Sequence, residues 1–249
     1  MSNLIKSHFE KILQADPTAL ADYSDSITCI VRVGSQPQTL NHVGIKALMT
    51  QVLSRVPFQK ADVLVNRTTA ASGVLTVKSS FAPFLSYACV AKNGKITGVT
   101  LYIYQPAENL KLETVSIPKS KEASKIFGKH FRAMFSLSAN VITKDYAENG
   151  VVITNMTKDV CDGKPQIYAF CDHLMKSCWM LLRKMDFHGI FSARWKVLSA
   201  GDGLLLFTIE APKMGMVMTE TYFVQNGKIQ FECSIADGAI LELVHELLN

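Results

Sequence analysis

The sequence predicts an α+β protein made of two tandem domains, each with helices packed on a curved antiparallel sheet. Three observations lead to this prediction. The chain repeats its own residue pattern at a shift of 122 to 133 positions, each copy begins with helical periodicity and continues with strand patterns, and each copy closes with the same Asn-Gly hairpin. The length of 249 residues also exceeds the usual size of a single domain, roughly 100 to 150 residues.

An amphipathic helix is predicted at the start of each copy. Its apolar positions recur at a spacing that places them on one stripe of a helix. A shift of 122 residues superimposes the two stripes, and a histidine followed by a phenylalanine stands at the same place in both. The first stripe is Leu4, Ile5, His8, Phe9, Ile12 and Leu13, and the second is Ile126, Phe127, His130, Phe131, Met134 and Phe135.

A shared strand and a second helix follow in each copy. The dipeptide Asp22-Tyr23 precedes a strand expected at 27–33, and Asp145-Tyr146 precedes one expected at 150–156. The second helix is expected at 45–53 and at 167–175, where apolar residues again superimpose at the shift of 122. Pro165 suits the first turn of the later helix, because an amide hydrogen there has no partner within the helix.

Four further strands complete each copy. Asn93-Gly94 and Asn226-Gly227 join the last two strands, and this dipeptide favours a tight hairpin because both residues tolerate a positive φ. Since the shift grows from 122 to 133 before this point, we expect an insertion around Arg183 to Ser192, in the loop after the second helix. The strands are expected at 61–66, 74–79, 86–91 and 96–104, and at 193–198, 204–209, 219–224 and 229–235.

The two copies are separated by a polar segment with a proline near each end. Residues 106–121 carry Pro106 and Pro118 and break both periodicities, so we expect one domain at 1–105, a linker at 106–121 and a second domain at 122–249. A small open sheet leaves one face uncovered, and a duplicated chain can cover that face with its twin. The copies are therefore predicted to pack as an intramolecular pseudo-dimer.

Composition and charge exclude several classes of protein. With 48% hydrophobic and 19% charged residues, the chain is expected to fold throughout. Residues 1–105 hold ten Lys and Arg against five Asp and Glu, which favours anionic ligands, but the charges are scattered and nucleic acid is not expected as a partner. We expect no membrane association and a cytoplasmic location, since neither a signal peptide nor a spanning segment is recognisable. Six cysteines, mostly among apolar neighbours, favour reduced and buried thiols.

This order of elements, with Asp-Tyr after the first helix and an Asn-Gly-Lys-Ile hairpin at the end, resembles the nuclear transport factor two-like superfamily, which includes ketosteroid isomerases and polyketide cyclase-like proteins. The stretch from Val33 to Leu53 is similar to the isomerase segment that leads into the second helix. The resemblance covers nearly the whole chain twice and implies two cone-shaped domains, each with a cavity between sheet and helices. Enzymes, small-molecule binders and interaction modules all use such cavities, so the fold leaves function open.

The catalytic residues of the isomerases have no counterpart in this sequence. The resemblance implies a tyrosine on the first helix that donates to an oxyanion, but Phe9 and Phe131 stand at those positions and have no hydroxyl. The aspartate that moves the proton falls near Val31 or Arg32 in one copy, and near Thr154 or Asn155 in the other. None of these side chains is a general base at neutral pH.

Two histidines and two tyrosines are the candidate catalytic residues. His8 and His130 lie on the apolar stripe of the first helix, where each is either a proton carrier tuned by burial or a core histidine with one satisfied hydrogen bond. Tyr23 and Tyr146 follow the recurring aspartate. Each either donates its phenol at the wide end of the cavity or packs its ring and bonds to the backbone.

The candidate ligand-binding residues are charged, polar or aromatic side chains expected near a cavity. Arg32 stands between Val31 and Val33 and therefore faces an anion, a partner or solvent. In the second copy, Glu220 and Glu232 are polar residues expected to reach the interior. The full set of ligand-binding candidates is Arg32, Phe9, Phe131, Asn155, Trp195, Glu220 and Tyr222.

No metal and no cofactor are predicted. Cys171, Asp172, His173 and Cys178 have the composition of a metal site, but helical geometry places the two cysteines on the apolar face and the other two residues elsewhere. The chain also lacks a Gly-rich phosphate loop, a nucleophile elbow and a zinc-protease motif.

The leading functional hypothesis is a protein that binds a small apolar or aromatic molecule in one or both cavities. One alternative is a cyclase, isomerase or hydratase-like enzyme acting in one cavity, with His8 or His130 as proton carrier and Tyr23 or Tyr146 as donor. The other alternative is a non-catalytic module whose sheet faces mediate association, including further self-association.

Overall fold

The computed structural model of the chain describes residues 3–184, 192–238, 241–242 and 245–246. Its two halves share one architecture. Each half has a six-stranded sheet, with the strand orders β2-β1-β6-β5-β4-β3 and β8-β7-β12-β11-β10-β9. The first long strand of each sheet runs parallel to the last, and the other neighbouring strands are antiparallel. The predicted tandem α+β fold is therefore confirmed.

The first half follows the predicted order of elements and adds one short strand. Its helices are α1 at Leu4–Leu13 and α2 at His42–Arg55, with short 3-10 helices at Pro17–Asp22 (η1) and Phe58–Lys60 (η2). The short strand β2 was not predicted. The strands are β1 Tyr23–Val33, β2 Pro37–Leu40, β3 Asp62–Thr68, β4 Ser72–Lys78, β5 Phe84–Lys92 and β6 Lys95–Tyr104.

The second half repeats this order with a longer second helix. Helix α5 has 21 residues where α2 has 14, so part of the predicted insertion extends the helix, and residues 185–191 lie outside the described residues. The helices are α3 Lys121–Met134, α4 Ala139–Ile142 and α5 Lys164–Lys184, with 3-10 helices η3 Thr143–Asp145 and η4 Pro212–Met214. The strands are β7 Tyr146–Thr154, β8 Cys161–Asp162, β9 Arg194–Ala200, β10 Leu204–Ala211, β11 Met216–Gln225 and β12 Lys228–Asp237.

Local sequence explains where these elements begin and turn. The side chains of Asn3, Asn41 and Ser120 cap the first turns of α1, α2 and α3 by accepting backbone N–H bonds. In both hairpins the Asn-Gly pair adopts positive φ, at 53° and 73° for residues 93 and 94 and at 55° and 68° for residues 226 and 227. These angles match the tight hairpin turn that the dipeptide predicted.

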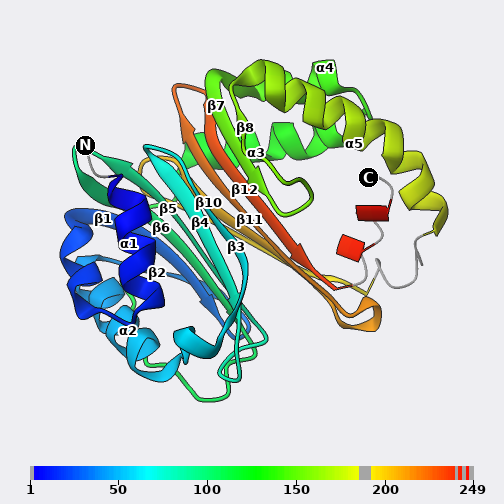
Figure 1. Ribbon diagram of the computed structural model, residues 1–249. Coiled ribbons are helices and arrows are strands. Elements are labelled where there is room, and N and C mark those ends of the chain that lie inside the picture. The colour runs from blue at the N-terminus through cyan, green and yellow to red at the C-terminus, as the bar shows by residue number, and fades with distance from the viewer. Residues whose placement is uncertain (1–2, 185–191, 239–240, 243–244, 247–249) are drawn as a thin grey trace.

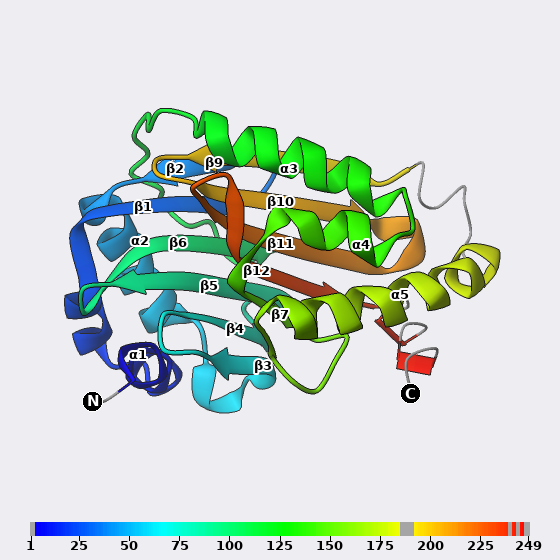
Figure 2. The same ribbon diagram turned by 90° about the horizontal axis from the view of Figure 1, so that it is seen from above.

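The two sheets pack face to face in the middle of the molecule, and the helices cover their outer faces (Figures 1 and 2). Alternate residues of each strand therefore point toward the helices of their own half or toward the twin sheet. The interface buries apolar side chains of both halves, among them Val74, Phe84 and Val90 against Val217, Phe231 and Ile235. The predicted intramolecular pseudo-dimer is confirmed.

The helix side of the first sheet is a closed apolar core. Residues from α1, α2, β1, β4, β5 and β6 fill it, and Phe9, Leu48, Val52, Val77 and Leu101 are fully buried there. The segment between the halves lies against this domain, where the amide of Val115 donates to Thr39 O at 3.0 Å and Gln51 exchanges two hydrogen bonds with the backbone of Lys111.

The cysteines with described side chains are free and buried: Cys29, Cys89, Cys161, Cys171 and Cys233. Within the described residues, no helix combines the length and the apolar character that crossing a membrane requires.

Candidate functional site

A histidine held by an aspartate occurs at the same place in both halves. In the first half, His8 Nδ1 lies 3.0 Å from Asp22 Oδ2, and Lys11 Nζ donates to Asp22 Oδ1 at 2.9 Å. In the second half, His130 Nδ1 lies 3.4 Å from Asp145 Oδ2, and Lys129 Nζ lies 2.6 Å from Asp145 Oδ1. The apolar stripe of the first helix turns each histidine inward, and each aspartate ends the 3-10 helix before the first strand. Asp22 fixes the orientation of the His8 ring by a hydrogen bond, whereas within the described residues His130 Nδ1 and both Asp145 oxygens are buried without a hydrogen-bond partner.

In the first half this arrangement continues into two tyrosines and stays neutral. His8 Nε2 lies 3.0 Å from the hydroxyl of Tyr87, which shares a hydrogen bond of 3.2 Å with the hydroxyl of Tyr23. Burial lowers the pKa of His8, and the nearby Asp22 offsets this effect only in part. The set is therefore a satisfied polar network inside the closed core.

In the second half two carboxylates replace part of this network. Strand pairing places Glu220 where the first half has Tyr87, and Glu232 where it has Val99. The hydroxyl of Tyr222 donates to Glu220 Oε2 at 2.6 Å, and Ser234 lies 3.5 Å from Glu220 Oε1.

The second carboxylate lies between His130 and Tyr146. The hydroxyl of Tyr146 donates to Glu232 Oε2, and His130 Nε2 lies 3.8 Å from the same oxygen and 3.4 Å from the Tyr146 hydroxyl. Two carboxylates, an imidazole and two phenols thus meet on the helix side of the second sheet.

Burial and mutual repulsion shift the proton affinities of this cluster. Burial, reinforced by the charge of Glu232, raises the pKa of Glu220 to about 7. The pKa of Glu232 is also raised by burial, against the opposing effects of His130 and Tyr146. Burial acts to lower the pKa of His130, but the contact with Asp145 and the charge of Glu232 outweigh it, so the pKa is raised. The raised pKa of His130 therefore favours its protonated form, and near neutral pH the carboxyl of Glu220 readily exchanges a proton.

Side chains around the cluster remain partly exposed, unlike their counterparts in the first half. Phe127, Phe131, Phe170, Leu174 and Ile209 are half-buried. The equivalent residues of the first half are all completely buried: Ile5, Phe9, Leu48, Val52 and Val77. The second half therefore presents accessible apolar surface where the first half is filled.

A line of aromatic rings connects the surface with the cluster. Phe135 is 72% exposed, and its ring centroid lies 5.3 Å from that of Phe131. Phe131 contacts Phe207 at 6.0 Å, Phe207 contacts Phe127 at 5.2 Å, and Phe127 contacts Tyr222 at 5.5 Å. Tyr222 in turn donates to Glu220, so packed aromatic rings extend from the surface to a buried carboxyl group.

The structure separates the candidate residues named from the sequence into two groups. His8, Tyr23 and Phe9 lie together inside the closed core of the first half. The candidates of the second half that lie together are His130, Tyr146, Phe131, Glu220 and Tyr222.

Arg32 does not face a cavity, and its assignment to ligand binding is corrected. Val31 and Val33 point into the first core, so alternation turns Arg32 toward the twin sheet. Arg32 is 1% exposed, and its guanidinium forms an ion pair with Glu210 of the second half and donates to Thr208. The charge of Arg32 is thus neutralised within the chain.

Asn155 and Trp195 lie at the margin of the second half. The amide of Asn155 is occupied by backbone, since its Nδ2 donates to Ala236 O at 2.6 Å and its Oδ1 accepts from Ala236 N at 3.1 Å. Asn155 therefore extends the pairing of β7 with β12 rather than presenting its amide to a ligand. Trp195 is 44% exposed, and its ring packs against Phe131 and Phe207.

The residues that contact the two histidines are not among the site residues predicted from the sequence. In the sequence, Asp22 and Asp145 stand out only as half of a recurring dipeptide, and no pattern marks Tyr87 or Lys129. The contact could have been predicted, because an aspartate recurs together with a helical histidine in both copies and the two groups can carry opposite charges. No group of three side chains suited to a metal ion occurs among the described residues, and the side chain of Cys178 is not among them.

No protein-family model and no curated protein matches the chain. Several solved structures are similar to it, one half at a time. A steroid delta-isomerase from Pseudomonas aeruginosa is 12% identical, with 53% of this chain and 93% of that chain covered and a TM-score of 0.38. An NTF2-like protein of unknown function from Cytophaga hutchinsonii is 12% identical (49% and 93% covered, TM-score 0.32). A ketosteroid isomerase-like structure from Kribbella flavida is 11% identical (48% and 81% covered, TM-score 0.32).

Proposed function

We propose that the second half is a proton-transfer enzyme of the isomerase or lyase type that acts on a small, largely apolar molecule. The observation that carries this proposal is the buried pair of Glu220 and Glu232 beside His130, reached by partly exposed aromatic side chains. A carboxyl whose pKa is raised to about 7 both accepts and returns a proton near neutral pH.

The residues of the cluster divide into a base and a group that balances charge. Glu220 is the exchanging base, with Tyr222 and Ser234 orienting its two oxygens. The raised pKa of His130 favours its protonated form, which offsets negative charge that develops on the substrate, while Tyr146 donates its proton to Glu232. Asp145 lies on the Nδ1 side of His130 and is itself paired with Lys129, so these two residues help to position the ring.

The first half takes a supporting role in this proposal. Its histidine network ends in Tyr87 and Tyr23, and it has no carboxylate at the positions of Glu220 and Glu232. Its core is closed by fully buried side chains. It covers the face of the second sheet that points away from α3, α4 and α5, as the twin subunit does in a dimer.

The proposal is tested with 5-nitrobenzisoxazole, a flat aromatic probe from which a carboxylate base removes the C3 proton while the N–O bond breaks and a coloured cyanophenolate leaves. We expect saturable turnover above the rate in acetate buffer, rising with pH as Glu220 ionises near pH 7. Glu220→Gln should lower kcat/KM at least about tenfold, because general-base catalysis contributes about 100-fold or more. Glu10→Gln, at an exposed position of α1, is the matched control.

Turnover no faster than buffer, or turnover that Glu220→Gln leaves unchanged, contradicts the enzyme. The same experiment bears on a second candidate, the binding of an apolar or aromatic molecule without reaction. The aromatic line from Phe135 to Tyr222 favours that candidate. Saturable quenching of protein fluorescence by the probe without product formation would support it.

A further inference from the structure

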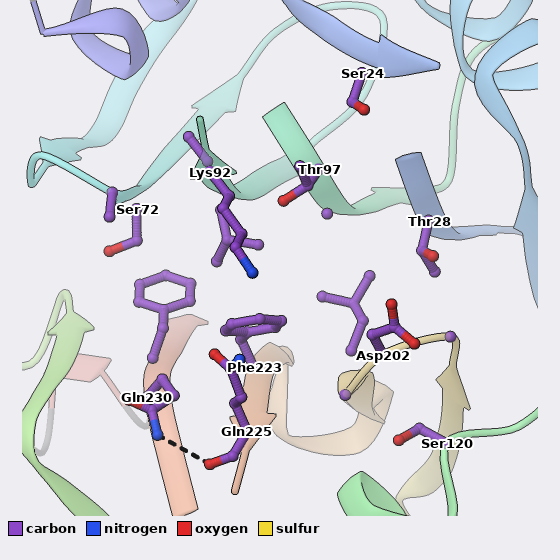
Figure 3. Close-up of a pocket in the computed structure, with 18 of the residues that line it drawn as sticks. Ser24, Thr28, Ser72, Lys92, Thr97, Ser120, Asp202, Phe223, Gln225 and Gln230 are labelled. Atoms are coloured by element: carbon purple, nitrogen blue, oxygen red, sulfur yellow. Dashed lines mark hydrogen bonds between the residues drawn. The ribbon is translucent and has the colours of Figure 1, made fainter. Parts of the chain in front are cut away.

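A cleft opens where the two halves meet, at the end of the sheets that carries the Asn-Gly hairpins (Figure 3). Its volume is about 1050 Å³, at the upper end of the range typical for small-molecule sites. Both halves and the start of α3 form its walls, and none of His130, Glu220 and Glu232 lines it. The cleft is therefore separate from the carboxylate cluster.

Small residues of the first half leave this space open. Strand pairing places Gly98 where the second half has Phe231, and Ser72 where the second half has Leu204. A Cβ atom at Gly98 would lie 2.8 Å from Val90 Cγ2 and 3.6 Å from Leu204 Cδ1. The cleft is therefore lined by small residues of the first half and by large apolar residues at the equivalent positions of the second half.

The lining of the cleft is polar and carries excess positive charge. Four lysines line it against two carboxylates, Glu122 and Asp202. Glu122 already accepts a bond from the backbone of Gly227, and Lys95 donates to Ala21 O at 2.7 Å. Hydroxyl and amide groups surround these charges, including those of Ser24, Thr28, Thr97, Gln225 and Gln230.

Lys92 is the cation best placed to meet a ligand. Its side chain extends from the first half across the cleft toward Phe223 of the second half (Figure 3). Within the described part of the chain, its ammonium group has neither an ion-pair nor a hydrogen-bond partner. Phe223 is half-buried and lines the opposite wall of the cleft, in the second half. An anion bound between the two halves would therefore give Lys92 the charge partner that the described part of the chain does not supply.

We propose that this cleft binds a small phosphorylated molecule rich in hydroxyl groups. Lys92 pairs with the phosphate, with Lys119 and Lys121 adding to the positive field. The hydroxyl and amide side chains exchange hydrogen bonds with the hydroxyl groups of the ligand, and Phe223 packs against a sugar ring or a base. Sugar phosphates and nucleotides share this chemistry.

Isothermal titration of the full chain with glucose 6-phosphate, AMP, glucose and inorganic phosphate tests the site. We expect saturable binding of glucose 6-phosphate or AMP. The ligand that binds more tightly shows whether the site prefers a sugar phosphate or a nucleotide. Glucose should bind at least about tenfold more weakly, because it lacks the charge-assisted bond to Lys92. Lys92→Gln should weaken binding of the phosphorylated ligand by about tenfold, and Ser26→Trp, at an exposed lining position, should abolish it.

Two controls separate this cleft from other sites. Lys60→Gln removes an exposed lysine outside the cleft and should leave the affinity unchanged. Glu232→Gln, in the carboxylate cluster, should also leave it unchanged, so the cleft and the proposed enzyme can fail independently. Absence of binding by both phosphorylated probes overturns the proposal. So does equal binding by wild type and by the folded Lys92→Gln and Ser26→Trp variants.

Discussion

Two positions decide whether the inherited histidine network is neutral or charged. Both halves keep the histidine and the aspartate, but Tyr87 and Val99 of the first half give way to Glu220 and Glu232 in the second. The pKa of His8 is accordingly lowered by burial, whereas that of His130 is raised by its acidic neighbours. Burying two carboxylates together costs stability, which proteins tolerate mainly at functional sites.

Glu220→Gln should therefore stabilise the protein at high pH. The pKa of Glu220 is raised from 4.5 to about 7, so between these values the folded state keeps a proton that the unfolded state releases. Stability from this group is complete below about pH 4.5 and is lost as pH rises through about 7. Glutamine stays neutral and still accepts from Tyr222. We expect a gain on the order of 3 kcal/mol at pH 8 and little change at pH 5.

Urea unfolding at pH 5 and pH 8 measures this difference. Glu10→Gln, at an exposed site, should show the same stability as wild type at both pH values. A gain that is equal at pH 5 and pH 8 would contradict the assignment, because it would not follow the ionisation of Glu220.

Residue patterns predicted part of this site and failed at Arg32 for a physical reason. His130 and Tyr146 were found because both recur in the two copies, and Glu220 because a charged residue interrupts a strand. Arg32 is expected to face an anion, a partner or solvent, and its place among the ligand-binding candidates follows the first of these alternatives. Strand β1 is buried on both faces, so its apolar neighbours do not reveal which face meets the helices. Only the packing of the second sheet decides that.

Among the elements, helices and long strands were predictable and the short edge strands were not. The amphipathic stripe located α1 and α3, and Asn-Gly located both hairpins. Strands β2 and β8 have four and two residues, too few to establish a period. Their pairing comes from the long strand beside each, β1 or β7. The insertion was assigned to a loop, but helical periodicity continues through part of it.

One glycine sets how closely a helix approaches its sheet. Gly73 of β4 faces α1, and a Cβ atom there would lie 2.7 Å from Ile5 Cγ2 and 3.0 Å from Phe9 Cε2. The second half has Leu205 at the equivalent position, beneath α3. A leucine keeps a helix further from its strand than a glycine does. This difference agrees with the partial exposure of Phe127 and Phe131.

Gly73→Ala should destabilise the protein by about 1 to 3 kcal/mol, because the added methyl group overpacks the contact with α1. Gly128→Ala is the matched control, since a Cβ atom there meets nothing within 4 Å. This control should be stabilising by about 0.5 to 1 kcal/mol, because alanine favours the helix interior. Urea midpoints at constant m-value provide both numbers. A Gly73→Ala variant as stable as wild type would show that α1 can move away without cost.

At the scale of the whole molecule, the two halves are joined by apolar packing that encloses a buried ion pair between Arg32 and Glu210. The apolar part follows from the uncovered face that a small sheet leaves, and it was predictable for that reason. The ion pair was not predictable, because its two residues, Arg32 and Glu210, lie 178 positions apart in the sequence. Tyr102 completes it by donating to Glu210 Oε1 at 2.7 Å while its ring lies under the Arg32 guanidinium at 5.1 Å.

Removing one charge of this ion pair should lower the free energy of unfolding more than removing both charges. Arg32→Leu leaves Glu210 charged and buried at 8% exposure, a change that costs about 3 to 5 kcal/mol. Adding Glu210→Gln removes that charge and keeps an acceptor for Tyr102, so the double variant should recover at least about half of the loss. Urea unfolding of the four proteins gives the coupling, and the exposed pair Lys164 and Glu148 serves as a control cycle that should show none. Additive losses at Arg32 and Glu210 would mean that apolar packing alone fixes how the two sheets sit on each other. A large coupling would mean that the ion pair selects this register between the halves, on which the cleft between them depends.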